Sequence, residues 1–129
     1  MSTSGSDTVY DLVGGMAFFV RLCRRFYEGI ADDPVLRPMY PDDLSGSIDL
    51  LAGFLAQYWG GPPDYSAARG HPRLRMRHAP FVIDRGARDR WLAHMLAALD
   101  ESDASDEVKL AMASYFDDAA THMINAPAE

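Results

Sequence analysis

Cysteine is nearly absent from this 129-residue chain, which contains only Cys23. A single cysteine forms no internal disulfide, and it cannot supply a structural zinc site of the multi-cysteine kind. We therefore expect a reducing, cytoplasmic setting. The chain also lacks a phosphate-cradling glycine loop, a His-Glu-x-x-His zinc motif and any spacing typical of a nucleophile with its base. These absences disfavour the simple hydrolases.

Basic residues are scarce as well, with 12 Lys and Arg against 19 Asp and Glu, and the formal net charge is −7. Arg73, Arg75 and Arg77 form the only dense basic run. A chain of this charge is a poor candidate for a nucleic-acid or membrane-surface partner, whose binding depends on clustered cations. No apolar run approaches the ~18 residues of a membrane span, and residues 1–7 lack the features of a secretory signal.

The composition is that of one ordinary globular domain, with 48% hydrophobic and 24% charged residues. We expect a disordered tail over residues 1–7, a single domain over 8–125 and a short C-terminal tail over 126–129. Periodicity does not measure exposed apolar surface, so the sequence leaves the oligomeric state open.

Apolar residues recur at intervals of three and four, which predicts an all-helical domain. The pattern indicates four substantial helices, over about 16–31, 46–59, 85–99 and 106–124, with Ser45 and Asp84 as candidate caps. Gly14-Gly15 separates the first from a short helical turn, and Asp33-Pro34 ends it. In the last helix, the residues expected to face inward are Leu110, Ala113, Phe116, Ala120 and Met123. A long connection with room for one brief helix, 73–79, precedes the third helix.

Four histidines are present, and the usual interpretation of each is a surface or satisfied core residue. His78 is the exception, because it shares a face with Leu74 on the brief helix, with Met76 and Phe81 nearby to form an apolar wall. A neutral imidazole that faces a nonpolar cavity is what haem iron requires. No Cys-x-x-Cys-His occurs, so a haem would be noncovalent. We assign no role to His94.

Tyr27, Tyr40 and Trp91 are candidates for the opposite wall of such a cavity. Aromatic residues at helical spacing are ordinarily plain core. Three buried phenol and indole donors need hydrogen-bond partners, however, and a partly negative bound dioxygen would supply an acceptor.

Two segments, FLAQYWGGP at 54–62 and RGHPRLRMRHAPF at 69–81, closely resemble the second group of truncated haemoglobins. YDLVGG at 10–15, RFY at 25–27 and residues 35–41 also fit this family, and the resemblance extends to about Asn125. It implies a two-over-two helical sandwich around haem b. It also implies that His78 is the proximal iron ligand and that Tyr27, Tyr40 and Trp91 form a distal hydrogen-bonding trio.

The resemblance further implies the remaining haem contacts. Ser47 stands where ordinary globins use a distal histidine, and the residues expected against the porphyrin are Leu51, Phe54, Leu55, Leu74 and Phe81. Leu50 departs from the family pattern, in which many members carry a basic residue that pairs with a haem propionate. Anchoring would then fall to Arg77, with Tyr65 and His71 behind it; a solvated charge is an equal interpretation of Arg77.

The function that follows is reversible, tight binding of dioxygen, nitric oxide, carbon monoxide or similar ligands at ferrous haem. The resemblance suggests redox work on the ligand, such as conversion of nitric oxide to nitrate or peroxidase-like turnover, with an external reductase. Two alternatives stay open: a haem-based sensor or oxygen store, and a haem-free helical interaction module.

Overall fold

The computed structural model describes residues 8–62 and 83–124. Within these ranges the chain is helical and contains no strand, as the periodicity predicts. The elements are α1 (Val9–Val13), α2 (Met16–Ala31), the 3-10 helix η2 (Arg37–Met39), α3 (Ser45–Tyr58), α6 (Arg85–Glu101) and α7 (Asp106–His122). None of the helices in the described part is long and apolar enough to cross a membrane. Both expected tails and the expected brief helix at 73–79 lie outside the described residues.

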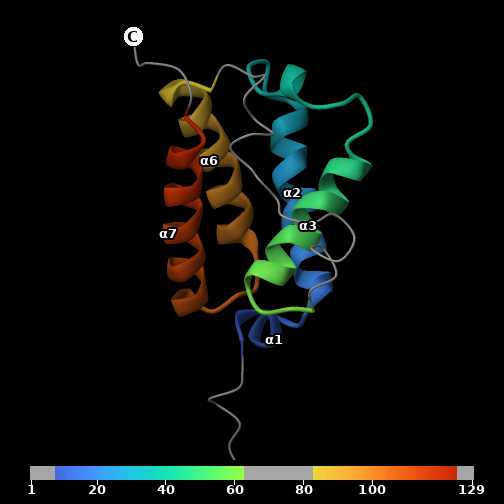
Figure 1. The fold of residues 1–129 in the computed structure, drawn as a ribbon, viewed down its shortest axis with the longest axis vertical. Helices are drawn as coiled ribbons and strands as arrows, with labels where there is room; N and C mark the ends of the chain where they lie inside the picture. The colour runs from blue at the N-terminus through green and yellow to red at the C-terminus, as the bar shows by residue number, and fades with distance from the viewer. Residues whose placement is uncertain (1–7, 63–82, 125–129) are drawn as a thin grey trace, which may run out of the picture.

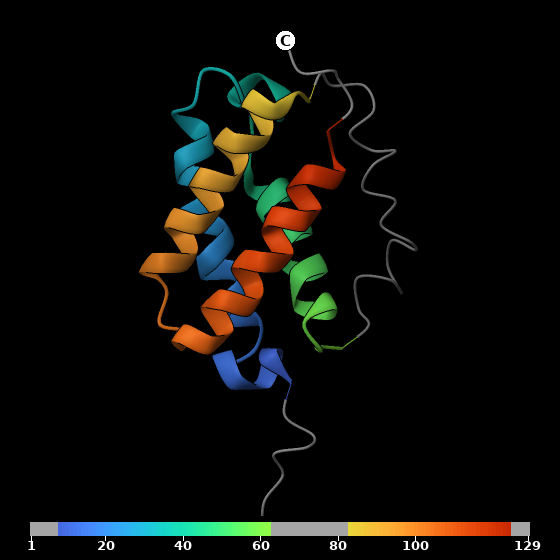
Figure 2. The same cartoon turned by 90° about the vertical axis from the view of Figure 1, so that its left-hand side faces the viewer.

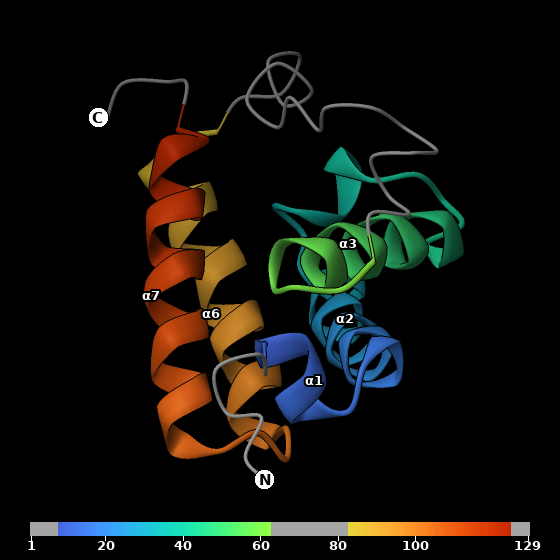
Figure 3. The same cartoon turned by 60° about the horizontal axis from the view of Figure 1, so that its bottom comes forward.

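The four long helices form two stacked pairs. Helices α6 and α7 run side by side as one pair, and α2 and α3 form the other (Figure 1). A second view shows α6 and α7 lying across the α2 and α3 pair (Figure 2), and α1 closes one end of the molecule (Figure 3). This is the two-over-two arrangement that the family resemblance implies.

Local sequence signals explain where most helices begin and end. Gly14 and Gly15 have φ angles of 98° and 82°, a conformation that favours glycine, and they separate α1 from α2. Helix α2 ends at Ala31, just before the Asp32-Asp33-Pro34 sequence. Asp84 caps α6 as predicted, because its carboxylate accepts a hydrogen bond of 2.8 Å from the Ala87 amide.

The predicted cap at Ser45 is wrong by one position. Helix α3 begins at Ser45 itself, and Leu44 is the capping residue without a side-chain bond. The Asp43 carboxylate accepts hydrogen bonds from the Ser45 amide and hydroxyl, at 2.9 and 2.8 Å. Asp43 therefore satisfies the Ser45 amide, which has no hydrogen-bond acceptor within the helix.

The core lies on one face of α2, whose buried residues are Phe18, Phe19, Leu22, Cys23, Phe26, Tyr27 and Ile30. On α7 the buried residues Val108, Met112, Phe116 and Ala120 recur every four positions. The prediction that Leu110 faces inward is wrong, because its side chain is 74% exposed. Leu110 lies two residues from Val108 and Met112, which turns it away from the buried face of α7.

The Asp84 cap gives a direct test of this fold. We expect Asp84→Ala to destabilise the protein by about 1 kcal/mol, since it leaves the Ala87 amide without its acceptor, and Asp84→Ser to restore most of the loss. Urea unfolding of the full chain would measure both effects. Asp103→Ala, at an exposed position between α6 and α7, is the control; an equal loss there would contradict the capping role.

Candidate functional site

A cavity of about 260 Å³ lies between the two helix pairs. Its walls come from α2, the segment around η2, α3, α6 and α7, and they are mostly apolar. The described lining residues are Tyr27, Leu36, Met39, Tyr40, Ser47, Leu50, Leu51, Phe54, Leu55, Ile83, Ala87, Arg88, Trp91, Tyr115, Phe116, Ala119, Ala120 and Met123. No carboxylate occurs in this described set.

Tyr27, Tyr40 and Trp91, the predicted donors, all line the cavity. They come from three separate elements: α2, the residue after η2, and α6. The rings of Tyr27 and Tyr40 meet edge to face, with centroids 5.4 Å apart. The Trp91 indole N–H is the hydrogen-bonding neighbour that lowers the pKa of the Tyr40 hydroxyl. Phe26 packs against two of these residues, with its ring centroid 4.9 Å from that of Tyr27 and 5.2 Å from that of Trp91.

Both phenols keep their protons at neutral pH. Burial raises the pKa of Tyr40 to about 12, although the hydrogen bond from Trp91 acts in the opposite direction. Burial also raises the pKa of Tyr27 well above its usual range, and the neighbouring Tyr40 and Cys23 add to the effect. The two hydroxyls are therefore neutral donors in apolar surroundings.

The other predicted residues divide into two sets. Ser47, Leu51, Phe54 and Leu55 all come from α3 and line the cavity, together with Leu50. The remaining predicted contacts lie outside the described residues: Tyr65, His71, Leu74, Arg77, His78 and Phe81. The structure thus places the α3 side of the predicted site, and the role of each residue toward a cofactor stays a prediction.

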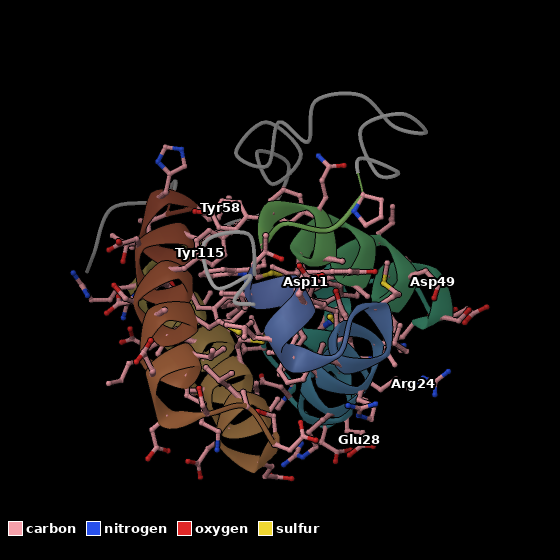
Figure 4. All side chains as sticks on the ribbon, turned by 90° about the horizontal axis from the view of Figure 1, so that it is seen from below. Asp11, Arg24, Glu28, Asp49, Tyr58 and Tyr115 are labelled. Carbon is pink, nitrogen blue, oxygen red and sulfur yellow. The ribbon has the colours of Figure 1, made fainter. Side chains whose placement is uncertain are left out.

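Helix α7 contributes lining residues that the sequence analysis missed. Tyr115 and Ala119 lie beside the buried stripe of α7, and Met123, predicted only as core, continues the same row at a spacing of four. The four-residue spacing of Tyr115, Ala119 and Met123 could have indicated from the sequence that they share one face. The Tyr115 ring packs 4.3 Å from that of Tyr58 on α3, and the two side chains meet between the helix pairs (Figure 4). Burial, then proximity to Tyr58, raises the pKa of Tyr115 to about 12.

Arg88 is the one cationic residue among the described lining residues, and sequence reasoning also missed it. Its guanidinium donates to Asp89 at 2.8 Å, to the Thr121 hydroxyl at 3.2 Å and to Asp117. The positive charge is therefore matched by carboxylates of α6 and α7. In residues 8–62 and 83–124, no group of three or more His, Cys, Asp or Glu side chains could hold a metal ion.

Comparison with known proteins gives a consistent result. The family model described as "Bacterial-like globin" matches residues 8–125. The group 2 truncated hemoglobin YjbI of Bacillus subtilis (strain 168) is 38% identical over 111 residues, which cover 86% of this chain and 84% of that protein.

Two solved structures share the fold along nearly the whole chain. A thermostable hemoglobin from Thermobifida fusca superposes with a TM-score of 0.91 and 52% identity, over 95% of this chain and all of the other. A truncated oxygen-avid haemoglobin from Bacillus subtilis gives a TM-score of 0.86 and 36% identity, over 92% of this chain and all of that one. The chain therefore belongs to the bacterial-like globin family, and within it to the group II truncated haemoglobins, which bind small ligands through haem.

Proposed function

We propose that the cavity holds haem b noncovalently and that the protein binds dioxygen tightly at the ferrous iron. The observation that carries this proposal is the group of three neutral donors, Tyr27, Tyr40 and Trp91, at a mostly apolar cavity. A largely apolar pocket with a few converging polar groups is the usual form of a cofactor site. The described cavity walls suit haem, because they offer apolar contacts to a flat macrocycle and contain no carboxylate.

Haem supplies the iron at which a diatomic ligand binds reversibly. In our proposal His78 holds that iron, and the globin domain that surrounds it spans residues 8–125 between two tails. Leu51, Phe54 and Leu55 of α3 would contact the porphyrin together with Leu74 and Phe81, and Ser47 would stand where ordinary globins use a distal histidine. Arg77, with Tyr65 and His71, would hold the propionates.

The distal residues act by donating hydrogen bonds to a ligand atom that carries partial negative charge. Trp91 donates to Tyr40, and this bond polarises the Tyr40 hydroxyl and strengthens it as a donor in turn. Tyr27 presents a second neutral phenol beside it. Because the surrounding walls exclude competing polar groups, each bond to the ligand is stronger than it would be in water. The related Bacillus subtilis structure is described as oxygen-avid, which supports tight binding here.

Tight retention favours reaction over delivery. We propose that the protein converts nitric oxide to nitrate in the cytoplasm, where an external reductase restores the ferrous state. The overall reaction combines nitric oxide, dioxygen and one electron to give nitrate. Carbon monoxide would bind as an unreactive ligand. Peroxidase-like turnover is a related use of the same site, and an oxygen store or sensor is the alternative without turnover.

The iron ligand is tested by absorption spectroscopy. We expect the purified, haem-loaded protein to show a Soret band and His78→Ala to lose the normal ferrous spectrum, because the iron would lose its protein ligand. His122→Ala, at an exposed position at the end of α7, is the matched control and should be unchanged. A wild-type protein without a Soret band, or a normal spectrum in His78→Ala, would refute the assignment.

The distal donors are tested by the rate of oxygen release. Tyr27→Phe and Trp91→Phe should each speed dissociation by roughly tenfold, since one hydrogen bond contributes about 1–1.5 kcal/mol. Stopped-flow displacement of dioxygen by carbon monoxide would measure the rates. Tyr58→Phe removes a phenol that is 53% exposed and outside the cavity lining, and it should release oxygen at the wild-type rate. Unchanged rates in both distal variants would sink the assignment.

Turnover is tested with the oxygenated protein and nitric oxide. We expect stoichiometric nitrate, formed faster than in buffer, and repeated cycles once a chemical or enzymatic reductant is added. The measurement is nitric oxide consumption at an electrode with nitrate determined afterwards. Nitrate production no faster than in buffer would leave the protein as a store or sensor.

A further inference from the structure

Asp33 is the only charged residue that is buried in the described part of the chain, with 5% of its surface exposed. It follows helix α2 and precedes Pro34, at the start of the corner that leads to Tyr40. A buried carboxylate is retained only where it is paired and hydrogen-bonded. The partners of Asp33 therefore indicate what its burial achieves.

Those partners come from two directions. Within the corner, the amides of Val35 and Leu36 donate to Asp33 Oδ1 at 2.9 and 3.1 Å. From helix α6, Arg90 donates to the same oxygen at 3.1 Å, and His94 Nε2 lies 2.8 Å from Oδ2. Burial raises the pKa of Asp33, but these hydrogen bonds, that of His94 first, outweigh it and lower the pKa to about 2. One ionised carboxylate thus joins the corner to α6.

The segment between Asp33 and Tyr40 is itself tightly bonded. The Arg37 amide donates to the Asp33 carbonyl at 2.9 Å. The Arg37 guanidinium donates to the carbonyls of Tyr40, Pro41 and Asp42 at 3.2, 2.9 and 2.8 Å. A shift of Asp33 relative to α6 would therefore carry Tyr40 with it.

We call Asp33 and its two α6 partners, Arg90 and His94, the Asp33 clamp. On α6 these two partners lie on either side of Trp91 in the sequence. Arg90 immediately precedes Trp91, and His94 follows it by three residues. The Asp33 clamp therefore joins the corner to α6, and the interaction of Tyr40 with Trp91 joins the same two segments.

Gly29 on α2 shows how closely the His94 ring is seated. A Cβ at position 29 would lie 2.5 Å from His94 Nδ1, which is too close for an undisturbed contact. Glycine inside a helix is unfavourable relative to alanine. Its presence here leaves room for the imidazole that reaches Asp33.

We propose that Asp33 is a positioning residue for the distal pocket: through Arg90 and His94 it fixes the corner against α6 and so sets how the Tyr40 hydroxyl is placed relative to the Trp91 indole. The proposal rests on the proposed function, because it assigns Asp33 a role in ligand retention. Asp33 itself does not line the cavity. It acts through Tyr40.

The first test is Asp33→Asn in the full-length, haem-loaded protein. Asparagine keeps the oxygen that accepts from the Val35 and Leu36 amides and from Arg90. It removes the negative charge and places an amide nitrogen where Oδ2 meets His94. We expect the Trp91 indole vibration, read by ultraviolet resonance Raman, to shift toward an unbonded N–H. The signal is separable, since the Trp59 indole nitrogen is buried and has no hydrogen-bond partner among the described residues. Oxygen release should accelerate by about three- to tenfold, as for one weakened donor.

Gly29→Ala is the second test, because it displaces the His94 ring and leaves the carboxylate in place. It should shift the same indole vibration in the same direction. The matched control is Asp43→Asn. Asp43 is a carboxylate shortly after the same corner, and its hydrogen bonds in the described part of the chain go to Ser45 on α3 and not to α6. The indole vibration and oxygen release of Asp43→Asn should therefore be those of the wild type.

Tyr40→Phe separates the possible failures. If Tyr40→Phe itself alters neither oxygen release nor the infrared stretch of bound carbon monoxide, the distal assignment in the proposed function fails. If Tyr40→Phe alters them while Asp33→Asn and Gly29→Ala keep the wild-type indole and ligand signals, the clamp is purely structural and the proposal is overturned, whatever the loss of thermal stability. Should Asp33→Asn fail to fold, Gly29→Ala and His94→Gln decide by the same criteria.

Discussion

Helix α2 packs against α3 on one side and α6 on the other, and the site depends on this double contact. Its largest fully buried side chains, Phe18, Phe19, Phe26 and Ile30, fill the space where the two helix pairs meet. Tyr27 follows Phe26 by one residue and faces the cavity. Because adjacent positions on one helix serve the core and the cavity wall, the close packing of the core also fixes the direction of the Tyr27 phenol.

The parts of the structure that the sequence predicted are those with local causes. Helix α2 has its predicted bounds because a glycine pair precedes it and an Asp-Pro pair follows it, and Asp84 caps α6 through a residue three positions away. The assignment failed on α7, where apolar residues occupy more than one face. Leu110 is exposed and Tyr115 lines the cavity, since the neighbouring helices decide which face is covered. The bond between Asp33 and His94 spans 61 positions and has no local signature.

Buried charge and apolar packing make different contributions to this pocket. Apolar walls stabilise the fold in proportion to the area they bury, but they are nondirectional and tolerate small shifts of the elements that carry them. A carboxylate with four hydrogen-bond donors has directional requirements. Such a group contributes less net stability than its contacts suggest, because desolvation opposes the attraction. In our proposal, its effect is to hold the corner in one arrangement against α6.

The character of the donors also determines which ligands the cavity distinguishes. Diatomic ligands are nearly equal in size, so apolar walls discriminate between them weakly. Neutral donors discriminate by charge: a ligand whose outer atom gains negative charge on binding receives the hydrogen bonds in full, and a less polar ligand such as carbon monoxide receives less. Burial keeps Tyr27 and Tyr40 protonated, and the Trp91 bond directs Tyr40. On the proposed function, selectivity for dioxygen would therefore follow from the protonation and alignment of these side chains rather than from the size of the cavity.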